Sequence, residues 1–375
     1  MKCLLIDDCA NLGWKSVIER VVIQEENCLE VALSVEDASE KLNIPFDIIF
    51  LDMRLTEADH KSSDVESYSG FSVLRRVKSD FVSVNYATPI ILITASNKIW
   101  NINAFLDNGI DAYYIKESPE FSIDKTWSRE NLENLQRNFL RLKELSLKRR
   151  EIWTFCNEII GLISSNKYLK SDNKRVTNIR ERIIDKLKLG YSELFQARSS
   201  AVKKTLVSSN ESISFIIFWS ILEEISKGFS SPNETWQLNS KRSTNWKFNN
   251  GEYFIKYGDS QVTLNFKRKI GGVEQGQFTF DVETAEYYNY LSDSIISLSD
   301  QIYALLSAYC SAEIDFNAKA KKFYSLNKYR NEMDFTHGSV NGIFTQPLIN
   351  DAKSEEAFDK NVEVLSFIRS VLSLS

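Results

Sequence analysis

The chain has 375 residues, enough for two or three domains, and its net charge of −5 argues against a protein that attracts nucleic acid with its whole surface. Its five cysteines are scattered, without a CxxC pair or a Cys/His cluster, so they indicate neither a disulfide framework nor a zinc site. No apolar run reaches membrane-spanning length and the sequence after Met1 lacks a signal-peptide pattern, so we expect a cytoplasmic protein with no membrane segment.

Residues 1–122 alternate short apolar runs with helical patterns, which predicts an α/β domain on a five-stranded parallel sheet. The expected strands are residues 2–6, 29–33, 46–52, 89–93 and 112–115. The expected helices are residues 13–22, 35–42, 70–78 and 99–108. The run that ends at Asp52 is apolar and too short for a helix, so we expect a buried strand there.

Acidic residues stand at the carboxyl ends of two expected strands, with Asp7 and Asp8 after the first and Asp52 closing the third. Parallel strands bring these ends to one edge of the sheet, where open α/β folds place their chemistry. Crowded carboxylates repel each other, and a divalent cation such as Mg²⁺, which prefers oxygen ligands, relieves the repulsion. The pattern predicts a Mg²⁺ site at which Asp52 attacks a phosphoryl donor, while Lys116 and Thr94 stabilise the phosphoryl oxygens.

This set of residues, in this order, resembles the receiver domain of two-component response regulators. The resemblance implies a flavodoxin-like fold, an aspartyl phosphate at Asp52 and a sensor histidine kinase as the phosphodonor. Asp7 and Asp8 match the paired acidic residues of the family, one of them a direct Mg²⁺ ligand, and the backbone carbonyl of Arg54 matches the remaining protein ligand. The further matches are the switch hydroxyl Thr94, the signature lysine Lys116, and Tyr113, the aromatic residue that turns inward on activation.

The segment after Asp52 departs from the receiver pattern. Thr56 stands where receivers usually have proline, and an insertion of residues 57–69 delays Gly70. The insertion is acidic and serine-rich without an apolar run, so we expect a solvated surface loop; direct action of its His60 on the phosphoryl group is the weaker alternative. The alternative for the whole domain is an unrelated Rossmann-like fold with carboxylates placed by chance.

Residues 127–164 carry apolar positions three and four apart, which predicts one long helix. We therefore expect residues 1–122 to form the receiver domain, residues 123–170 a linking helix and residues 171–375 an output domain. Basic residues along the helix, from Arg137 to Arg150, indicate a solvated face rather than an RNA-binding strip. Such a helix is also a natural route for passing a receiver signal onward.

The remaining sequence predicts a mainly α-helical C-terminal domain with a small antiparallel β insertion. The expected helices are residues 179–199, 212–228, 284–308, 313–324 and 355–374. Turn signals at Asn249-Asn250-Gly251 and Gly258-Asp259 separate short β-like runs. They predict one antiparallel meander at about residues 244–281, with strands at 245–248, 252–257, 261–269 and 276–281.

The stretch from Arg330-Asn331 to His337-Gly338 resembles the signature of HEPN domains, which are all-α ribonucleases and RNA-binding modules. The resemblance implies a homodimer with paired sites, in which His337 transfers protons, Arg330 stabilises charge on the phosphate and Asn331 completes the motif. The motif is short, and the inserted strands depart from the simplest HEPN bundle. Arg330 with Asp334 could instead be a helix ion pair, and His337 a cation at a helix C-terminus.

Together these observations predict a response regulator that is phosphorylated on Asp52 and controls a HEPN-like output domain. That domain would be a metal-independent ribonuclease, with stress response or phage defence as the setting that the resemblance suggests. The alternative is a non-catalytic output domain that binds RNA or protein when the receiver is phosphorylated. A DNA-binding transcription factor is disfavoured, because the acidic chain offers no helix-turn-helix with a basic recognition helix.

Overall fold

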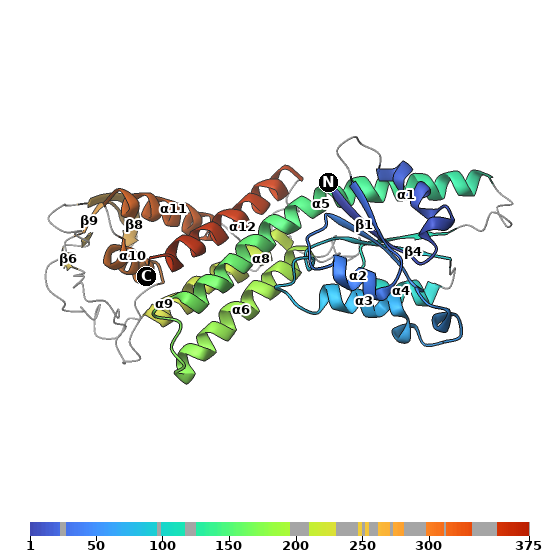
Figure 1. The fold of residues 1–375 in the computed structure, drawn as a ribbon. Helices are drawn as coiled ribbons and strands as arrows, with labels where there is room; N and C mark the ends of the chain where they lie inside the picture. Colours follow the sequence, from blue (N-terminus) through green and yellow to red (C-terminus); the bar gives the residue numbers. More distant parts are fainter. Residues whose placement is uncertain are drawn as a thin grey trace. The chain divides into compact units, whose positions relative to one another are not determined.

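The structure, a computed structural model, describes residues 1–22, 28–95, 99–116, 125–195, 210–229, 247–249, 252–254, 262–270, 273–280, 298–310, 313–331 and 351–374. The chain divides into two compact units, Met1–Trp153 and Thr154–Ser375 (Figure 1). Among the helices that the structure describes, none is both long enough and apolar enough to cross a membrane.

The N-terminal unit is built on a five-stranded parallel sheet, as predicted, in the order β2-β1-β3-β4-β5. Strands β1, β3 and β4 are buried throughout or nearly so, because helices cover both faces of the sheet and leave no place for the alternating polar residues of a half-exposed strand. The strands are β1 (Lys2–Ile6), β2 (Cys28–Ala32), β3 (Ile48–Asp52), β4 (Ile90–Thr94) and β5 (Ala112–Ile115).

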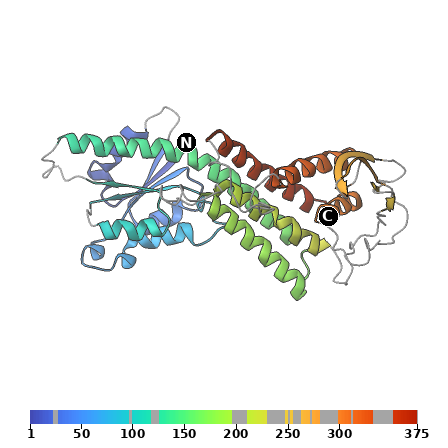
Figure 2. The ribbon, with the colours of Figure 1, turned by 180° about the vertical axis from the view of Figure 1, so that it is seen from behind.

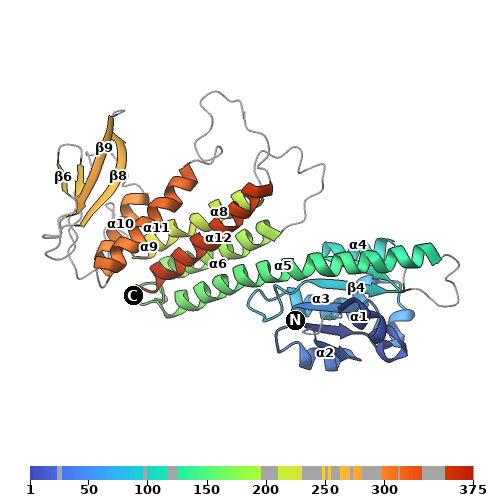
Figure 3. The same ribbon diagram turned by 90° about the horizontal axis from the view of Figure 1, so that it is seen from above.

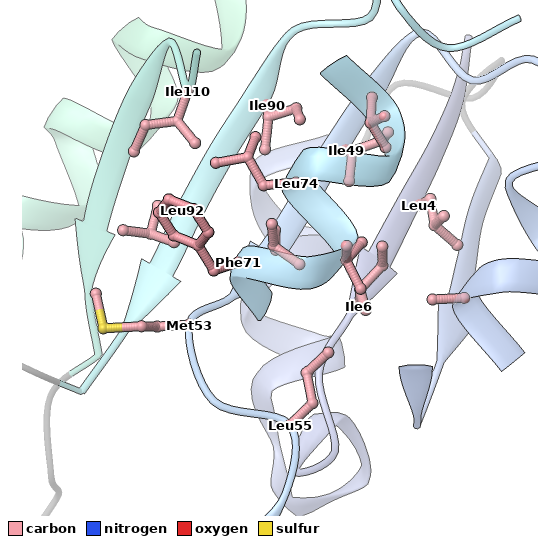
Figure 4. Packing of buried hydrophobic residues seen from close by; sticks show 14 of the residues in the cluster. Leu4, Ile6, Ile49, Met53, Leu55, Phe71, Leu74, Ile90, Leu92 and Ile110 are labelled. Atoms are coloured by element: carbon pink, nitrogen blue, oxygen red, sulfur yellow. The ribbon is translucent and has the colours of Figure 1, made fainter. Parts of the chain in front are cut away.

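Two separate cores lie on the two faces of this sheet. On one face, Phe71 and Leu74 of one helix pack against Ile49 and Leu92 of the strands (Figure 4). The helices on that face are α2 (Val35–Lys41), α3 (Ser69–Lys78) and α4 (Ile99–Asp107), visible below the sheet in Figure 1. The helices on the other face are α1 (Trp14–Val22), which follows the short 3-10 helix η1 (Ala10–Leu12), and the first half of α5 (Lys125–Ser165).

Helix α5 is longer than predicted at both ends and belongs in part to the sheet. Leu135, Phe139 and Leu142 are buried in the core of the N-terminal unit, and Phe139 stacks on Phe50 of β3 with ring centroids 6.3 Å apart. Figure 2 shows this part of the helix, in green, running along the sheet. The helix predicted as a linker therefore also covers one face of the sheet in the N-terminal unit. The predicted domain boundary at residue 122 stays a prediction.

The insertion after β3 is mostly exposed, as the sequence predicts, but it is more ordered than a simple loop. It forms two 3-10 helices, η2 (Glu57–His60) and η3 (Val65–Ser67), and its Asp59 and Tyr68 are buried. Hydrogen bonds to Asp59 hold this segment, and Tyr68 and the partly buried Val65 pack on the hydrophobic core.

The described helices of the C-terminal unit pack around an aromatic core. Trp219 stacks on Phe323 with ring centroids 5.3 Å apart, and Phe323 stacks on Phe367 at 5.6 Å. Figure 3 shows several of these helices side by side. They are α6 (Lys174–Phe195), α8 (Asn210–Trp219), α9 (Ile221–Phe229), α10 (Leu298–Tyr309), α11 (Glu313–Asn331) and α12 (Asp351–Leu372).

Several of these helices differ from the prediction. Helix α6 begins at Lys174, inside a segment whose polar residues suggested a loop, and α11 continues to Asn331 rather than ending near residue 324. The single helix expected over residues 212–228 is interrupted at Ser220, whose hydroxyl donates to the Ile217 carbonyl (2.7 Å) and competes with the helical bonding. Residues 196–199 and 284–297 of the other expected helices lie outside the described residues.

The β insertion forms two antiparallel hairpins rather than one meander. Strands β6 (Lys247–Asn249) and β7 (Glu252–Phe254) pair with each other, and β8 (Val262–Ile270) pairs with β9 (Val273–Phe280). The prediction overlooked Gly271-Gly272, a strong two-residue turn signal that separates β8 from β9. The turn expected at Gly258-Asp259 lies outside the described residues.

Candidate phosphoacceptor site

Strand register brings the predicted site residues to one edge of the sheet. Ile6 of β1 lies opposite Leu51 of β3, so Asp7 and Asp52 both come next along neighbouring strands. On the other side of β3, Asp52 lies opposite Ile93, which immediately precedes Thr94. These carboxyl ends are where doubly wound sheets bind ligands.

Lys116 connects the two buried carboxylates. It follows β5, and its backbone N–H donates to the carbonyl of Thr94 (2.7 Å), which fixes where its side chain starts. Its ammonium forms ion pairs with Asp7 Oδ2 (2.9 Å) and with Asp52 Oδ2. All three side chains are almost fully buried, so one cation faces two carboxylates in a low-dielectric setting.

Burial is the main influence on the ionisation of this cluster. It raises the pKa of Asp52 to about 6, although the Lys116 ammonium acts in the opposite direction. Burial alone would lower the pKa of Lys116, but the carboxylates of Asp52 and Asp7 outweigh it and raise the pKa, so Lys116 is charged at neutral pH. When ionised, Asp52 therefore carries a poorly solvated negative charge, which a bound cation would stabilise.

The residues at this edge fit a divalent cation. Asp7, exposed Asp8 and Asp52 carry three carboxylates against the single charge of Lys116, and the fully buried Asp7 Oδ2 has no partner besides that ammonium among the described residues. The carboxylates of Asp7 and Asp8 lie within 4.8 Å of each other and of the Cys9 thiol. Oxygen ligands in excess of the local positive charge suit Mg²⁺, with the Arg54 backbone carbonyl as the further ligand that the receiver pattern implies.

The other predicted residues lie around this centre. Thr94 is buried, and its hydroxyl contacts Met53 Sδ (3.8 Å). The Arg54 backbone N–H approaches Asp52 Oδ1 (3.4 Å). Tyr113 lies on β5 with 41% of its surface exposed, so its ring points away from the core in this state.

Three residues near the site were missed by reasoning from sequence. Trp14, in the helix expected over residues 13–22, has its ring 5.4 Å from Lys116 Nζ in a cation–π contact. The backbone N–H of Cys9 donates to Asp7 Oδ1 (2.9 Å) and thereby orients that carboxylate. Asp59, counted as a loop acid, is buried beneath the segment that follows Asp52. The spacing of Thr56 and Asp59, which fits a helix capping box, is the sequence signal that could have distinguished Asp59 from the other acids of the insertion.

The second predicted site is described only in part. Arg330 and Asn331 end helix α11, and Arg330 Nη1 donates to Asn331 Oδ1 (3.0 Å). The preceding Tyr329 packs edge-on against Phe215, with ring centroids 5.0 Å apart. His337 lies outside the described residues, together with Asp334 and Gly338, so the pairing of Arg330 with His337 stays a prediction.

Comparison with known proteins gives matches among solved structures. No protein-family model matches the chain, and no curated protein is significantly similar to it. A receiver domain from Methanospirillum hungatei JF-1 is 19% identical with a TM-score of 0.28, over 38% of this chain and 94% of that one. The response regulator DrrB from Thermotoga maritima is 23% identical with a TM-score of 0.27, over 38% of this chain and 52% of that one.

A response regulator from Burkholderia pseudomallei, whose structure holds a phosphorylated aspartic acid and a calcium ion, is 20% identical with a TM-score of 0.25. That match covers 36% of this chain and 74% of the other. The strand order β2-β1-β3-β4-β5, with helices on both faces, is by itself the order of doubly wound flavodoxin-like sheets. The N-terminal unit therefore has a doubly wound, flavodoxin-like fold.

Proposed function

We propose that this chain is a two-component response regulator in which Asp52 accepts a phosphoryl group from a sensor histidine kinase. The observation that supports the proposal is the buried group of Asp7, Asp52 and Lys116 at the carboxyl edge of the sheet, beside the exposed Asp8. A buried acidic pair with one shared lysine is a costly arrangement for stability alone, because charge is withdrawn from water without full compensation.

In the proposed reaction, an Asp52 carboxylate oxygen attacks phosphorus and the bond from phosphorus to the donor's nitrogen or oxygen breaks. Asp7, Asp8, Asp52 and the Arg54 carbonyl would hold Mg²⁺, which would supply charge neutralisation for the phosphoryl oxygens when bound. Lys116, no longer needed to balance the free Asp52 carboxylate, would pair with a phosphoryl oxygen. The buried hydroxyl of Thr94 would donate to another, and that movement would leave room for Tyr113 to turn inward.

A small phosphodonor tests this proposal without the kinase. Incubation of the full chain with acetyl phosphate and Mg²⁺ should add one labile phosphoryl group, and the Asp52→Ala variant should add none. The Asp8→Ala variant should fold normally, since Asp8 is exposed, but should not be phosphorylated at the wild-type rate. Equal labelling of wild type and Asp52→Ala would refute the assignment.

For the output, we propose that the C-terminal helical unit is a HEPN-like domain that cleaves RNA without a metal ion, acts as a homodimer and works in the cytoplasm. Support comes from the Arg330-Asn331 pair at the end of a long helix whose exposed face carries Lys321 and Lys328. Those cations could attract a phosphate backbone.

The competing proposal is an output domain that binds RNA or protein without chemistry. RNA incubated with phosphorylated and unphosphorylated protein in EDTA distinguishes the two. A ribonuclease should leave 2′,3′-cyclic phosphate ends and lose activity in His337→Ala and Arg330→Ala, because proton transfer typically contributes about 10²–10⁴-fold. Retained RNA binding with no cleavage in either state would favour the binding module.

A further inference from the structure

The segment that joins Asp52 to helix α3 is fastened from both sides. Met53 and Leu55 are buried in the core beneath α3, so Arg54 is the one residue of the three whose side chain leaves that core (Figure 4). Its guanidinium lies over the ring of Tyr68, 4.9 Å away, and donates to the Tyr68 hydroxyl (3.1 Å). Because Met53 and Leu55 are held in the core, the contacts of these two residues determine where the Arg54 carbonyl lies.

The buried carboxylate of Asp59 holds the residues immediately after Arg54. Its Oδ2 accepts hydrogen bonds from the backbone N–H groups of Leu55 (3.0 Å) and Thr56 (3.1 Å), and from the Ser69 hydroxyl. Its Oδ1 accepts from the Ser69 backbone N–H (3.1 Å). The Ser69 hydroxyl oxygen also accepts from Leu55 N–H (2.9 Å). One carboxylate thus ties the two ends of the insertion together.

Asp59 is compensated by dipoles rather than by a countercharge. It is 5% exposed, and no described lysine or arginine forms an ion pair with it. Burial alone would raise the pKa of Asp59, but the hydrogen bonds from Ser69, Leu55 and Thr56 outweigh burial and lower the pKa, so the carboxylate is ionised at neutral pH. A charged group at this depth needs all of its donors, because losing them leaves its charge unsolvated.

A purely local role would explain only part of this arrangement. Asp59 and Thr56 form a capping box that begins η2, and that motif accounts for the bond to Thr56 N–H. The bonds to Leu55 and to both donors of Ser69 reach beyond η2, to the end of the strand segment and to the start of α3. Thr56 also occupies the position where proline is usual in receivers. Proline would restrict the backbone but has no N–H, whereas Thr56 has an N–H that donates to Asp59.

We propose that Asp59, with Ser69, is a positioning residue for cation binding: it fixes the backbone of residues 55–56 and so holds the Arg54 carbonyl ready as a Mg²⁺ ligand. The inference rests on the proposed phosphoacceptor function. It assigns to the insertion a role in preparing the site before metal or phosphodonor arrives. Partners that orient metal ligands in this way typically contribute about 10–100-fold to metal affinity or activity.

The test compares Asp59→Ala and Ser69→Ala with Asp64→Ala. Asp64 is the matched control, because it is an exposed aspartate of the same insertion that caps η3 through Glu66 N–H (3.0 Å) and does not contact residues 54–56. The first measurement is hydrogen exchange of the residue 53–57 peptide in metal-free protein. The second is binding of Mn²⁺ followed by electron paramagnetic resonance, with Mg²⁺ as competitor. The third is the Mg²⁺ concentration for half-maximal phosphorylation by acetyl phosphate.

Asp59→Ala should speed exchange at residues 55–56, weaken Mn²⁺ and Mg²⁺ binding by about tenfold or more, and recover most of its phosphorylation rate at saturating Mg²⁺. Ser69→Ala should change the exchange rate and the cation affinity in the same direction but by less, and Asp64→Ala should match wild type. If Asp59→Ala does not fold, Asp59→Asn replaces it, since an amide keeps the shape but cannot accept from both sets of donors.

A lower melting temperature with unchanged metal affinity in the folded Asp59 variant would overturn the inference and leave only a cap for η2. The proposed function fails separately, in the wild-type protein: if wild type neither binds the cations nor is phosphorylated, the phosphoacceptor proposal is refuted, and the positioning role is refuted with it.

Discussion

Replacing Asp52 with asparagine should stabilise the metal-free N-terminal unit at neutral pH. The pKa of Asp52 is raised from 3.8 to about 6, so the folded protein holds this proton more tightly than the unfolded chain does. Stability is therefore lost as pH rises from about 4 through about 6, and the loss is constant above that window. At about 1.4 kcal/mol for each pH unit between the two pKa values, the ionised carboxylate costs about 3 kcal/mol at pH 7, as an upper bound.

The asparagine variant removes that cost and leaves Lys116 paired with Asp7. We expect the opening free energy of the N-terminal unit to rise by up to about 3 kcal/mol at pH 7 in EDTA. The increase should fall to about half of that at pH 5, where wild-type Asp52 is mostly protonated. Native-state hydrogen exchange of peptides that cover β3 and β4 measures the opening free energy of this unit alone. Asp8→Asn is the control, because that carboxylate is exposed. An unchanged or lowered opening free energy at pH 7 would show that the Lys116 ion pair outweighs burial, and the reasoning would be wrong.

Two further substitutions test the packing around Asp52. Lys116→Met should destabilise the unit by about 3–5 kcal/mol, because it leaves two buried carboxylates without a cation. In a thermal melt, added Mg²⁺ should restore part of the lost stability. A melting temperature that Mg²⁺ does not change would contradict the predicted cation site. Gly70→Ala should cost at least about 2 kcal/mol in urea denaturation, since a Cβ there would lie 2.2 Å from the Asp52 carbonyl oxygen and 2.7 Å from that of Met53. A tolerated alanine would mean that α3 can move away from β3 freely.

The parallel sheet could be predicted from sequence because each strand is a short apolar run bounded by polar or turn residues. The predicted ends fall within a few residues of the observed ones, and Asp52 closes β3 as expected. Site residues at strand ends follow from topology, which explains why Asp7, Asp52, Thr94 and Lys116 meet. Periodicity and parallel pairing carry that information directly.

Other features depend on contacts that no local pattern contains. The apolar spacing of α5 is continuous, so the sequence does not show at which residue the helix stops packing against the sheet. The spacing of Thr56 and Asp59 indicates at most a local helix cap, and the hydrogen bonds from the backbone of Leu55 and Ser69 are seen only in the structure. Trp14 has the spacing of an ordinary core residue, and only the structure puts Lys116 near its ring.

The most direct test of the central claim is to map the phosphoryl group by fragment mass spectrometry after reaction with acetyl phosphate and Mg²⁺. We expect a single modification on Asp52 that is absent in EDTA. It should be reduced in Lys116→Met, because Lys116 contacts the accepting carboxylate. A modification on His60 or on any other residue, or labelling of Asp52 that does not depend on Mg²⁺, would contradict it.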